Sequence, residues 1–312
     1  MAHPRLRTVL AGQGCVRALR DGTVAPRGFE FEFVEVPVLV DAFRRMVRGL
    51  EFDVCEMAIT TYLCARDHGK GFTALPVFVQ RGRHHGMICY NTRSGVRHPK
   101  DLEGRRVGVN RGYTVTTGVW VRAILQEEYG LDLDRVTWVR SGDEHVTEVD
   151  LPDNVETMDP AHTLRELLIA GELAAVVGVK IDHPDVRPLI PDATRAAESA
   201  FRTRGFHPIN HLVVVRDDRL AAHPDLATAL VEAFATAKDR YLADLRSGAI
   251  GDPTETDDRN ARILAITGGD PLPYGVPANR AMIDELVGHA VRQGILDKRM
   301  TPDDLFVTTG GS

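Results

Sequence analysis

The sequence predicts an α/β protein of two lobes, each built around a mostly parallel sheet, with a ligand cleft between the lobes. Two observations predict this class. Short apolar segments of strand length alternate with amphipathic segments of helix length along most of the 312 residues. The alternation also restarts after Asn91 and returns near residue 207 to a last buried strand, so one α/β unit is inserted into another. A chain of this length can bury the cores of two such units.

The first series of elements extends to Asn91. Strands are predicted where apolar residues alternate with polar ones or form a short continuous run, and helices where apolar residues recur every three to four positions. The predicted strands are 6–12, 29–36, 52–59, 72–79 and 86–91, and the predicted helices are 40–50 and 60–69.

The second series again alternates strand and helix. Gly130 and Gly171 each follow a segment of helical periodicity and are predicted to end a helix. In chain order the predicted elements are a strand ending at Asn110, a helix at 115–130, a strand at 135–140, a polar stretch at 141–160, a helix and a strand within 162–179, and a Pro-rich segment at 181–192.

The rest of the chain returns to the first lobe and is mostly helical. The predicted elements are a strand within 206–218, helices at 224–245 and 279–296, and a polar linker at 251–260. The crossings between the lobes are expected near 87–91 and 205–211. The first lobe would then comprise 1–90 and 208–312, and the inserted second lobe 91–207.

Composition excludes several classes of protein. Hydrophobic content of 43% and charged content of 26% are typical of a globular protein in water. The net charge of −6 and the absence of a long basic run argue against nucleic acid as a partner. No segment approaches the ~20 apolar residues of a membrane span, so no membrane partner is expected. Because the first 22 residues contain no apolar run of signal-peptide length, we expect a cytoplasmic protein.

Motifs for metals and nucleotides are missing from the sequence. No two of the four cysteines, Cys15, Cys55, Cys64 and Cys89, have C-x-x-C spacing, and no H-E-x-x-H occurs. There is no G-x-x-x-x-G-K-[ST], no G-x-G-x-x-G after a strand and no G-x-S-x-G. We therefore expect no metal site and no nucleotide cofactor.

Residues 107–120, VGVNRGYTVTTGVW, place four hydroxyl side chains at one strand-to-helix junction. A helix start has unpaired backbone N–H groups and partial positive charge, which together attract an anion. Capping of the helix is the simpler interpretation, but a single threonine would be enough for it. We therefore predict that this junction binds an anionic ligand. The predicted binding residues are Asn110, Tyr113, Thr114, Thr116 and Thr117.

Segments along nearly the whole chain carry a resemblance to a known group. They read EFDVCEMAITTYL, LPVFVQRGRHHGMICYN, PKDLEGRRVGVN, GVWVRAILQEEYGLDLDRVTWV, HPINHLVVVRDD and DPLPYGVPANR. In their order and in their residues, these segments resemble the 4,5-dihydroxyphthalate decarboxylase family. The resemblance implies the fold of type II periplasmic solute-binding proteins. It also implies a decarboxylase of a hydroxylated aromatic carboxylate, with 4,5-dihydroxyphthalate as the leading substrate and protocatechuate as the product.

Three positions depart from the family's pattern. The first strand of the family usually leads into an Asp-Tyr-Asp-Arg-like turn, whereas this chain has Gly12-Gln13-Gly14-Cys15. The turn after Asn110 is richer in threonine than is usual, and His84 stands where arginine is more usual. Because all three positions would face a ligand, an enzyme that acts on a different carboxylate stays an alternative.

Decarboxylation of such a ring requires protonation of the carbon that carries the departing carboxylate. A hydroxyl para to that carbon can supply electrons, so no cofactor is required. The site has to bind two carboxylates, place a proton donor beside the ring and keep the departing group poorly solvated. The expected partner is therefore a small anionic aromatic substrate, and the sequence leaves a homo-oligomer open.

Residues 80–85, QRGRHH, provide cations and proton donors. If this segment is extended, Arg81, Arg83 and His85 share one face and His84 lies on the other. We predict Arg81 as a carboxylate anchor, with Arg83 and His84 as further substrate ligands. His85 is predicted as the general acid or proton relay, because histidine titrates near neutral pH and apolar residues follow it directly. The alternative is a solvated surface loop.

Two more catalytic candidates come from the first lobe. Glu56 lies at the end of a predicted strand, where ligands of α/β sheets bind, and would accept hydrogen bonds from the ring hydroxyls. Otherwise it would cap the helix that begins near Thr60. His211 precedes a buried strand and is either a second acid/base or a core histidine. By contrast, residues 143–145 are expected to form a solvated loop.

The rival function is a non-enzymatic solute-binding protein, either the receptor of an ABC importer or a cytoplasmic sensor, for a small aromatic or other carboxylate. The anion-binding junction would serve that role equally well. The histidines and arginines near the predicted crossings favour an enzyme, although a fold alone does not determine function.

Overall fold

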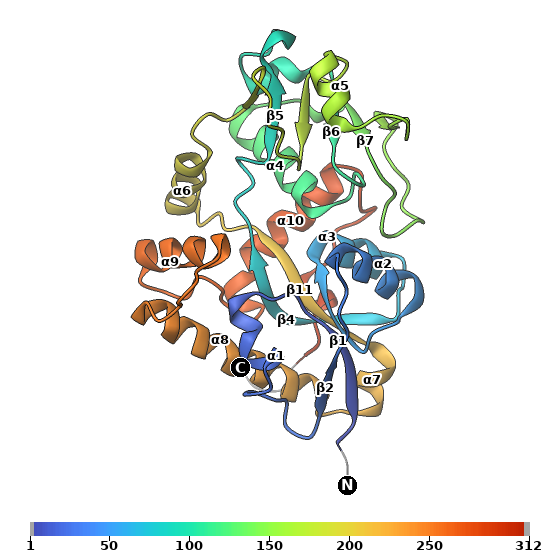
Figure 1. The fold of residues 1–312 in the computed structure, drawn as a ribbon. Coiled ribbons are helices and arrows are strands. Elements are labelled where there is room, and N and C mark those ends of the chain that lie inside the picture. The colour runs from blue at the N-terminus through green and yellow to red at the C-terminus, as the bar shows by residue number, and fades with distance from the viewer. Residues whose placement is uncertain (1–2, 309–312) are drawn as a thin grey trace. The chain divides into compact units, whose positions relative to one another are not determined.

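The structure is a computed structural model that describes residues 3–308 (Figure 1). These residues form two units. Unit 1 contains residues up to 81, 211–281 and from 300 onward, whereas unit 2 contains 82–210 and 282–299. The chain therefore passes from unit 1 to unit 2 nine residues earlier than the sequence predicts. Residues 282–299, expected in the first lobe, belong to unit 2.

Unit 1 contains a five-stranded sheet of order β2-β1-β3-β11-β4. The strands are β1 (Arg5–Val9), β2 (Glu30–Phe33), β3 (Val54–Ala58), β4 (Phe72–Arg81) and β11 (Ile209–Arg216). β1 pairs in parallel with both β2 and β3. β11 is antiparallel to β3, so that His211 lies opposite Ala58 and Val213 opposite Glu56. The carboxyl ends of β1 and β3 therefore lie at the same edge as the start of β11.

In unit 1, helix α2 packs against β3 of this sheet through an apolar face. On α2, buried Ala42, Phe43, Met46 and Val47 recur at the spacing of one helix face. The helices are α1 (Arg17–Arg20), α2 (Leu39–Gly49), α3 (Ile59–Asp67), α7 (Asp217–Ala222), α8 (Leu226–Ser247), α9 (Glu255–Thr267) and α11 (Pro302–Leu305).

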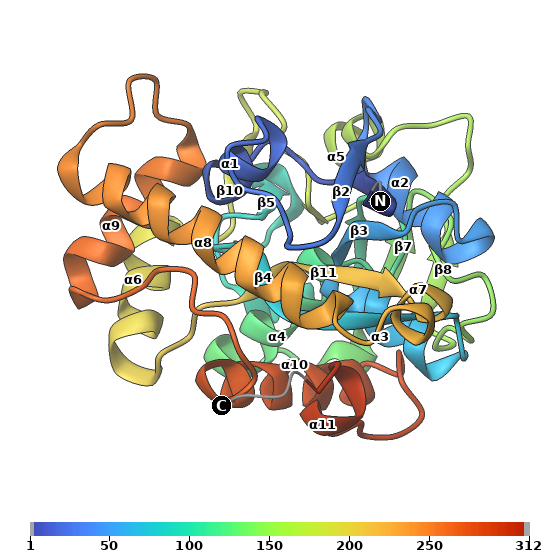
Figure 2. The same cartoon turned by 90° about the horizontal axis from the view of Figure 1, so that it is seen from below.

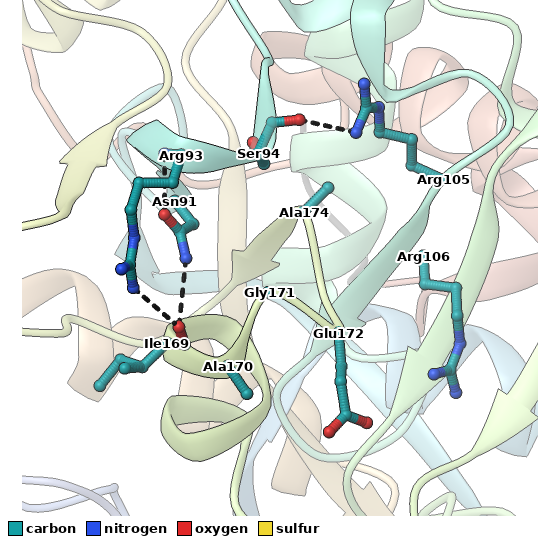
Figure 3. Close-up of a pocket in the computed structure, with 10 residues that line it drawn as sticks. All are labelled: Asn91, Arg93, Ser94, Arg105, Arg106, Ile169, Ala170, Gly171, Glu172 and Ala174. Atoms are coloured by element: carbon teal, nitrogen blue, oxygen red, sulfur yellow. Dashed lines mark hydrogen bonds between the residues drawn. The ribbon is translucent and has the colours of Figure 1, made fainter.

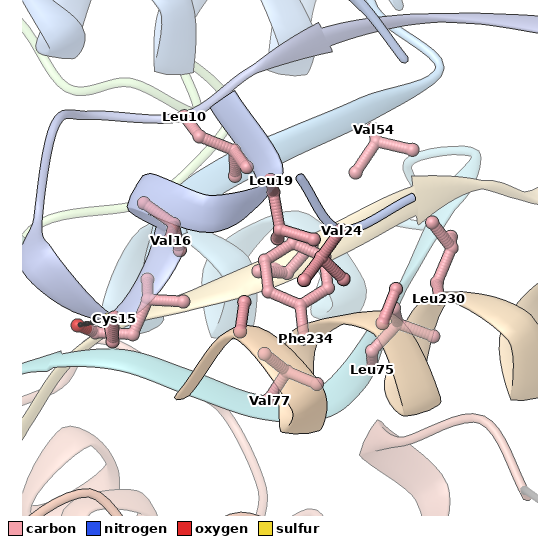
Figure 4. Close-up of a cluster of buried hydrophobic side chains, with 14 of the residues drawn as sticks. Leu10, Cys15, Val16, Leu19, Val24, Val54, Leu75, Val77, Leu230 and Phe234 are labelled. Carbon is pink, nitrogen blue, oxygen red and sulfur yellow. Dashed lines mark hydrogen bonds between the residues drawn. The ribbon is translucent and has the colours of Figure 1, made fainter. Parts of the chain in front are cut away.

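Helix α8 runs along β4 and β11 (Figure 2). Its Leu230 and Phe234 lie in an apolar cluster with Leu75 and Val77 of β4 (Figure 4). Full burial of a phenylalanine contributes on the order of 2 kcal/mol. Cys15 and Val16, which follow the first loop, are buried in the same cluster. The cluster therefore fixes the chain that follows β1.

Unit 2 contains a six-stranded sheet of order β10-β5-β9-β6-β7-β8. The strands are β5 (Ile88–Asn91), β6 (Arg106–Val109), β7 (Thr137–Arg140), β8 (Val155–Thr157), β9 (Ala175–Val177) and β10 (Val186–Pro188). From β9 to β8 the neighbours are parallel, and β5 is antiparallel to both β9 and β10. The helices are α4 (Thr116–Tyr129), α5 (Leu164–Ala170), α6 (Ala193–Arg204) and α10 (Arg280–Arg292).

The predicted α/β class is confirmed, and the glycine stops are where the sequence places them. Gly130 and Gly171 follow α4 and α5 with φ of 67° and 82°, a conformation that glycine adopts without steric cost. The predicted linker at 251–260 was wrong in its second half, because α9 begins at Glu255. Thr254 and Asp257 form a capping box there, so polar residues that resemble a linker start a helix.

Besides α9, six short or polar elements were not predicted from the sequence: α1, β8, β10, α6, α7 and α11. Helix α6 buries only alanines, Ala197 and Ala200, and so has no apolar stripe to detect. None of the helices within residues 3–308 is long and apolar enough to cross a lipid bilayer.

Candidate functional site

Glu56 lies in β3, a strand whose five residues are all buried. Its side chain has no exposed surface. The carboxylate accepts hydrogen bonds from the backbone N–H of Ala11 at 2.8 Å and from Nε2 of Gln13 at 2.7 Å. Its Oε1 also lies 2.6 Å from Nδ1 of His211. These partners offset the cost of removing a carboxylate from water. Glu56 is therefore a fixed acceptor, not a cap for α3.

His211 projects from the start of β11 with its side chain 18% exposed. A carboxylate only accepts hydrogen bonds, so the Nδ1 that faces Glu56 carries a hydrogen. Nε2 is the ring nitrogen that does not face Glu56. The ring of Phe43 packs edge-on against the imidazole, with 5.3 Å between the centroids. Glu56 and Phe43 thus hold His211 in one orientation, the arrangement of an acid/base histidine.

Gln13 joins this pair from the loop that follows β1. Its turn was expected to face a ligand, but Gln13 itself was assigned no role, although it follows the carboxyl end of the first strand, where ligands of α/β sheets bind. The glycine beside it has a packing reason. A Cβ at Gly14 would overlap the ring of Tyr241.

Arg81 is the last residue of β4, which neighbours β11 in the sheet. Its guanidinium is buried and donates a hydrogen bond to the side-chain oxygen of Asn279. Asn279 in turn donates to the carbonyls of Pro273 and Gly275, at 2.9 and 2.7 Å. Burial lowers the pKa of Arg81 to about 10, so the group remains a cation at neutral pH. Asn279 thus fixes a buried positive charge at the end of β4.

Cys15 follows this loop but does not have the properties of a nucleophile. It is buried, and its thiol donates to the carbonyl of Val79 at 3.4 Å. Burial, and then the charge of Glu56, raise the pKa of Cys15 to about 12. The thiolate, which is the reactive form, is therefore disfavoured at neutral pH.

The hydroxyl-rich junction of unit 2 holds a carboxylate of the protein itself. Glu144 accepts hydrogen bonds from the backbone N–H groups of Tyr113 and Thr114, at 2.6 and 3.0 Å. It also accepts one from the Thr114 hydroxyl at 2.7 Å. A Cβ at Gly112 would overlap this carboxylate. The expectation that residues 143–145 form a solvated loop was wrong, because Glu144 and His145 are buried.

The backbone of the junction is held in an uncommon conformation. Arg111 has a φ of 69°, which is rare for a residue other than glycine. Its N–H donates to the Ser141 hydroxyl at 2.9 Å, and its carbonyl accepts from the N–H groups of Ser141 and Gly142. Through these hydrogen bonds, the loop after β7 holds the turn after β6 in this conformation.

The predicted junction residues differ in what their side chains contact. The Tyr113 hydroxyl donates to the carbonyl of Gln293 at 3.2 Å, and the ring lies against the Arg122 guanidinium. Asn110 donates to the carbonyl of Gly178 at 3.1 Å. Asn110, Tyr113 and Thr114 therefore all have partners within the protein.

Helix α4 itself begins without a side-chain cap. The residue before it is Val115, which has no side-chain oxygen to accept a hydrogen bond, so capping does not explain the threonines. Thr116 is buried and Thr117 is half-buried in the first turn. These two remain in the position of an anion site at a helix start.

His85 is placed away from that helix start. It is buried, and its Nε2 lies 2.9 Å from Glu128. Glu128 is twelve residues along α4 from Thr116, about 18 Å at the rise of an α-helix. Although burial opposes the change, hydrogen bonds and charges from His85 and Arg204 lower the pKa of Glu128. The structure thus does not bring His85 and the junction together.

The segment after β4 also differs from the prediction. Residues 82–84 are irregular and 85–86 form a turn, so Arg81, Arg83 and His85 do not share the face of an extended strand. Arg83 lies 3.8 Å from Glu198, and the His84 Nε2 lies 2.8 Å from the side-chain oxygen of Asn210. All four of these residues lie in unit 2.

Unit 2 also has a cavity of about 640 Å³, lined by arginines (Figure 3). Arg93 pairs with Asp185, Arg105 donates to the carbonyl of Ser94, and Arg106 pairs with Glu156. Arg106 begins β6, whereas Asn110 follows its end. The cavity therefore lies at the opposite edge of the sheet from the hydroxyl-rich junction. Among residues 3–308, no three His, Cys, Asp or Glu side chains are grouped as metal ligands.

Comparison with known proteins agrees with this architecture. Residues 51–180 match the family described as NMT1/THI5 like. The alkanesulfonate-binding protein SsuA from Xanthomonas axonopodis pv. citri, solved with bound MOPS, has a similar fold with a TM-score of 0.55. That match covers 98% of this chain and 99% of SsuA at 15% sequence identity. The predicted periplasmic-binding-protein-like fold is therefore confirmed.

Two relatives are more similar in sequence. A 4,5-dihydroxyphthalate decarboxylase of Comamonas testosteroni is 31% identical over 324 aligned positions, which cover 98% of this chain and 97% of the relative. A 4,5-dihydroxyphthalate decarboxylase of Pseudomonas putida is 33% identical over 205 positions, which cover 61% of this chain and 79% of the relative. With a likeness that extends over the full length of the first relative, this chain belongs to the 4,5-dihydroxyphthalate decarboxylase family.

Proposed function

We propose that this protein is a decarboxylase that converts 4,5-dihydroxyphthalate to protocatechuate and carbon dioxide, with His211 as the proton donor. The observation that carries the proposal is the Glu56–His211 pair at 2.6 Å. The names of the two relatives support the substrate.

The reaction needs one proton at one ring carbon. The imidazolium of His211 donates its Nε2 proton to the carbon that bears the departing carboxylate, while the para hydroxyl supplies electron density to the ring. The bond to the carboxylate then breaks, its electron pair restores the aromatic ring, and carbon dioxide leaves. One proton is consumed, and solvent reprotonates His211.

Glu56 is a positioning residue in this scheme. All of its hydrogen bonds go to the protein, and it has no exposed surface. We therefore move it from the role of hydroxyl acceptor to that of orienting His211 and stabilising the imidazolium. His211 and not His85 is the proposed proton donor, because Glu128 holds His85 at the far end of α4.

The substrate of this reaction is a dianion, so cationic and N–H ligands are required. Arg81 is the proposed carboxylate anchor, since its cation is fixed by Asn279 at the end of β4. Within unit 2, Asn110, Thr116 and Thr117 remain proposed ligands at the start of α4. No cofactor takes part in the proposed steps.

The first test is conversion of 4,5-dihydroxyphthalate by the purified, chelator-treated protein, with the loss of substrate and the appearance of protocatechuate both measured. We expect turnover in the wild type and in His85→Asn. In His211→Asn we expect kcat to fall by about 10²- to 10⁴-fold, the range for loss of a general acid.

Two results would contradict the proposal. Loss of turnover in His85→Asn with retention in His211→Asn would return the proton donor to His85. Tight binding without turnover in the wild type would favour the rival, a solute-binding protein. The cytoplasmic location and the oligomeric state stay predictions, which cell fractionation and light scattering test.

A further inference from the structure

The loop after β1 contains a polar group that the proposed mechanism does not use. This group is the side-chain carbonyl of Gln13. Nε2 of Gln13 donates to Oε1 of Glu56 at 2.7 Å. Since a carboxylate cannot donate, the amide nitrogen has to face Glu56, and the carbonyl Oε1 points away from it. The orientation of this amide is therefore fixed by the same carboxylate that orients His211.

The Gln13 carbonyl is buried, and no donor within residues 3–308 lies in hydrogen-bond distance of it. A buried acceptor without a donor is unfavourable and is rare in folded proteins. Glu56 differs in this respect, because its two oxygens have three donors. Of the two side chains with acceptor oxygens in this cluster, Gln13 is thus the one whose oxygen lacks a partner.

We propose that Gln13 is a specificity-determining residue whose side-chain carbonyl accepts a hydrogen bond from a hydroxyl on the substrate ring. The inference rests on the proposed function and extends it to the feature of the substrate that the site selects. A phenolic O–H is a donor, so it satisfies this carbonyl. A ring without hydroxyls leaves the carbonyl unpaired, which is the arrangement by which polar sites reject an analogue strongly.

The loop geometry supports a fixed position for this carbonyl. The Gln13 backbone carbonyl accepts from the N–H of Val16 at 3.1 Å, and Cys15 and Val16 are anchored in the apolar cluster below. The side chain is held at its other end by Glu56. An acceptor fixed at both ends loses little conformational entropy when a ligand binds.

The test compares two small ligands, protocatechuate and benzoate, which differ by the two ring hydroxyls. Neither carries the carboxylate that the proposed reaction removes, so calorimetry gives dissociation constants without turnover. The variant is Gln13→Met, which keeps the length of the side chain and removes its polar atoms. Gln126→Met is the matched control, since the Gln126 side-chain carbonyl is also buried without a donor in the described chain but lies in α4 of unit 2.

We expect the wild type and Gln126→Met to bind protocatechuate at least tenfold more tightly than benzoate. In Gln13→Met the preference should fall at least tenfold, with benzoate affinity unchanged within about twofold. Weaker binding of both ligands by the same factor would overturn the inference, because Gln13 would then act only by holding Glu56. An unchanged preference would overturn it as well.

Conversion of 4,5-dihydroxyphthalate by the same preparations separates the two hypotheses. A wild type that prefers protocatechuate through Gln13 but converts no substrate overturns the proposed reaction alone. A wild type that converts the substrate while Gln13→Met keeps the wild-type preference overturns the assignment of Gln13 alone.

Discussion

At the scale of single residues, the chemistry of unit 1 depends on which atoms already have partners. Glu56 and Arg81 are both buried ions, but they are held in different ways. Glu56 is surrounded by donors, whereas Arg81 donates a hydrogen bond to the neutral side chain of Asn279. Asn279 fixes the position of the guanidinium, and a fixed guanidinium suits the proposed role of carboxylate anchor.

Arg81 is expected to contribute to substrate binding. In Arg81→Met, which keeps most of the side-chain volume, we expect KM for 4,5-dihydroxyphthalate to rise by about 10- to 100-fold, because a charged hydrogen bond contributes roughly 1.5–3 kcal/mol. Steady-state kinetics measure this change. Circular dichroism controls for folding, and a KM within twofold of the wild-type value in a folded variant would show that the carboxylate binds elsewhere.

The pH dependence of Arg81 has a defined sign. Burial lowers its pKa to about 10, so the cation is present below that pH and is lost as the pH rises through it. Any binding that depends on this cation should therefore be constant near neutral pH.

At the scale of elements, the β6–α4 junction is a helix start at which the nearest backbone N–H groups already donate hydrogen bonds to Glu144. The loop after β7 supplies both Glu144 and the contacts that hold Arg111 at a φ of 69°. Glu144 partly neutralises the charge of this helix start, and we propose the first turn of α4, with Thr116 and Thr117, as the ligand site. The junction therefore combines a structural carboxylate with a proposed ligand site.

Two substitutions separate these roles. Glu144→Gln should destabilise the protein by about 1–3 kcal/mol, since one of its buried hydrogen-bond partners would face an amide donor instead of an acceptor. The double variant Thr116→Val, Thr117→Val should instead raise KM. Urea denaturation and steady-state kinetics measure the two quantities. An unchanged KM in the double variant would remove the first turn of α4 from the substrate site.

At the scale of the whole molecule, unit 2 is completed by residues 282–299, which are separated from the rest of it by residues 211–281. Gln293, just after α10, accepts a hydrogen bond from the Arg122 Nε at 2.7 Å and donates to the carbonyl of Val119 at 3.1 Å. Arg122 is fully buried in α4. The C-terminal part of the chain thus supplies polar partners for a buried cation.

Gln293 is therefore expected to matter for stability and not for chemistry. Gln293→Met should lower the free energy of unfolding by about 2–3 kcal/mol, because the hydrogen bond to the charged Arg122 is lost and no water can replace it readily. Chemical denaturation measures the loss. Gln126→Met is the control, because the buried side-chain carbonyl of Gln126 accepts no hydrogen bond within the described residues. Equal stability of the two variants would show that Arg122 finds another partner.

The sequence by itself determined the α/β class, the order of the longer strands and helices, and the ends of α4 and α5. These features follow from local periodicity and from glycine at helix ends, which act over a few residues. It also singled out Glu56, His211 and Arg81, because strand ends, and charged residues next to apolar segments, can be recognised from the sequence. The segments that resemble the decarboxylase family also indicated a class of substrate.

Only the tertiary structure decided which of these side chains meet. Glu56 and His211 are 155 residues apart and become partners because β3 and β11 are neighbours in the sheet. Glu144 fills a turn 30 residues away, and His85 is paired with the far end of α4. A hydrogen bond depends on the distance between two atoms, and for residues so far apart that distance is set by the packing of strands and helices, not by their spacing in the chain.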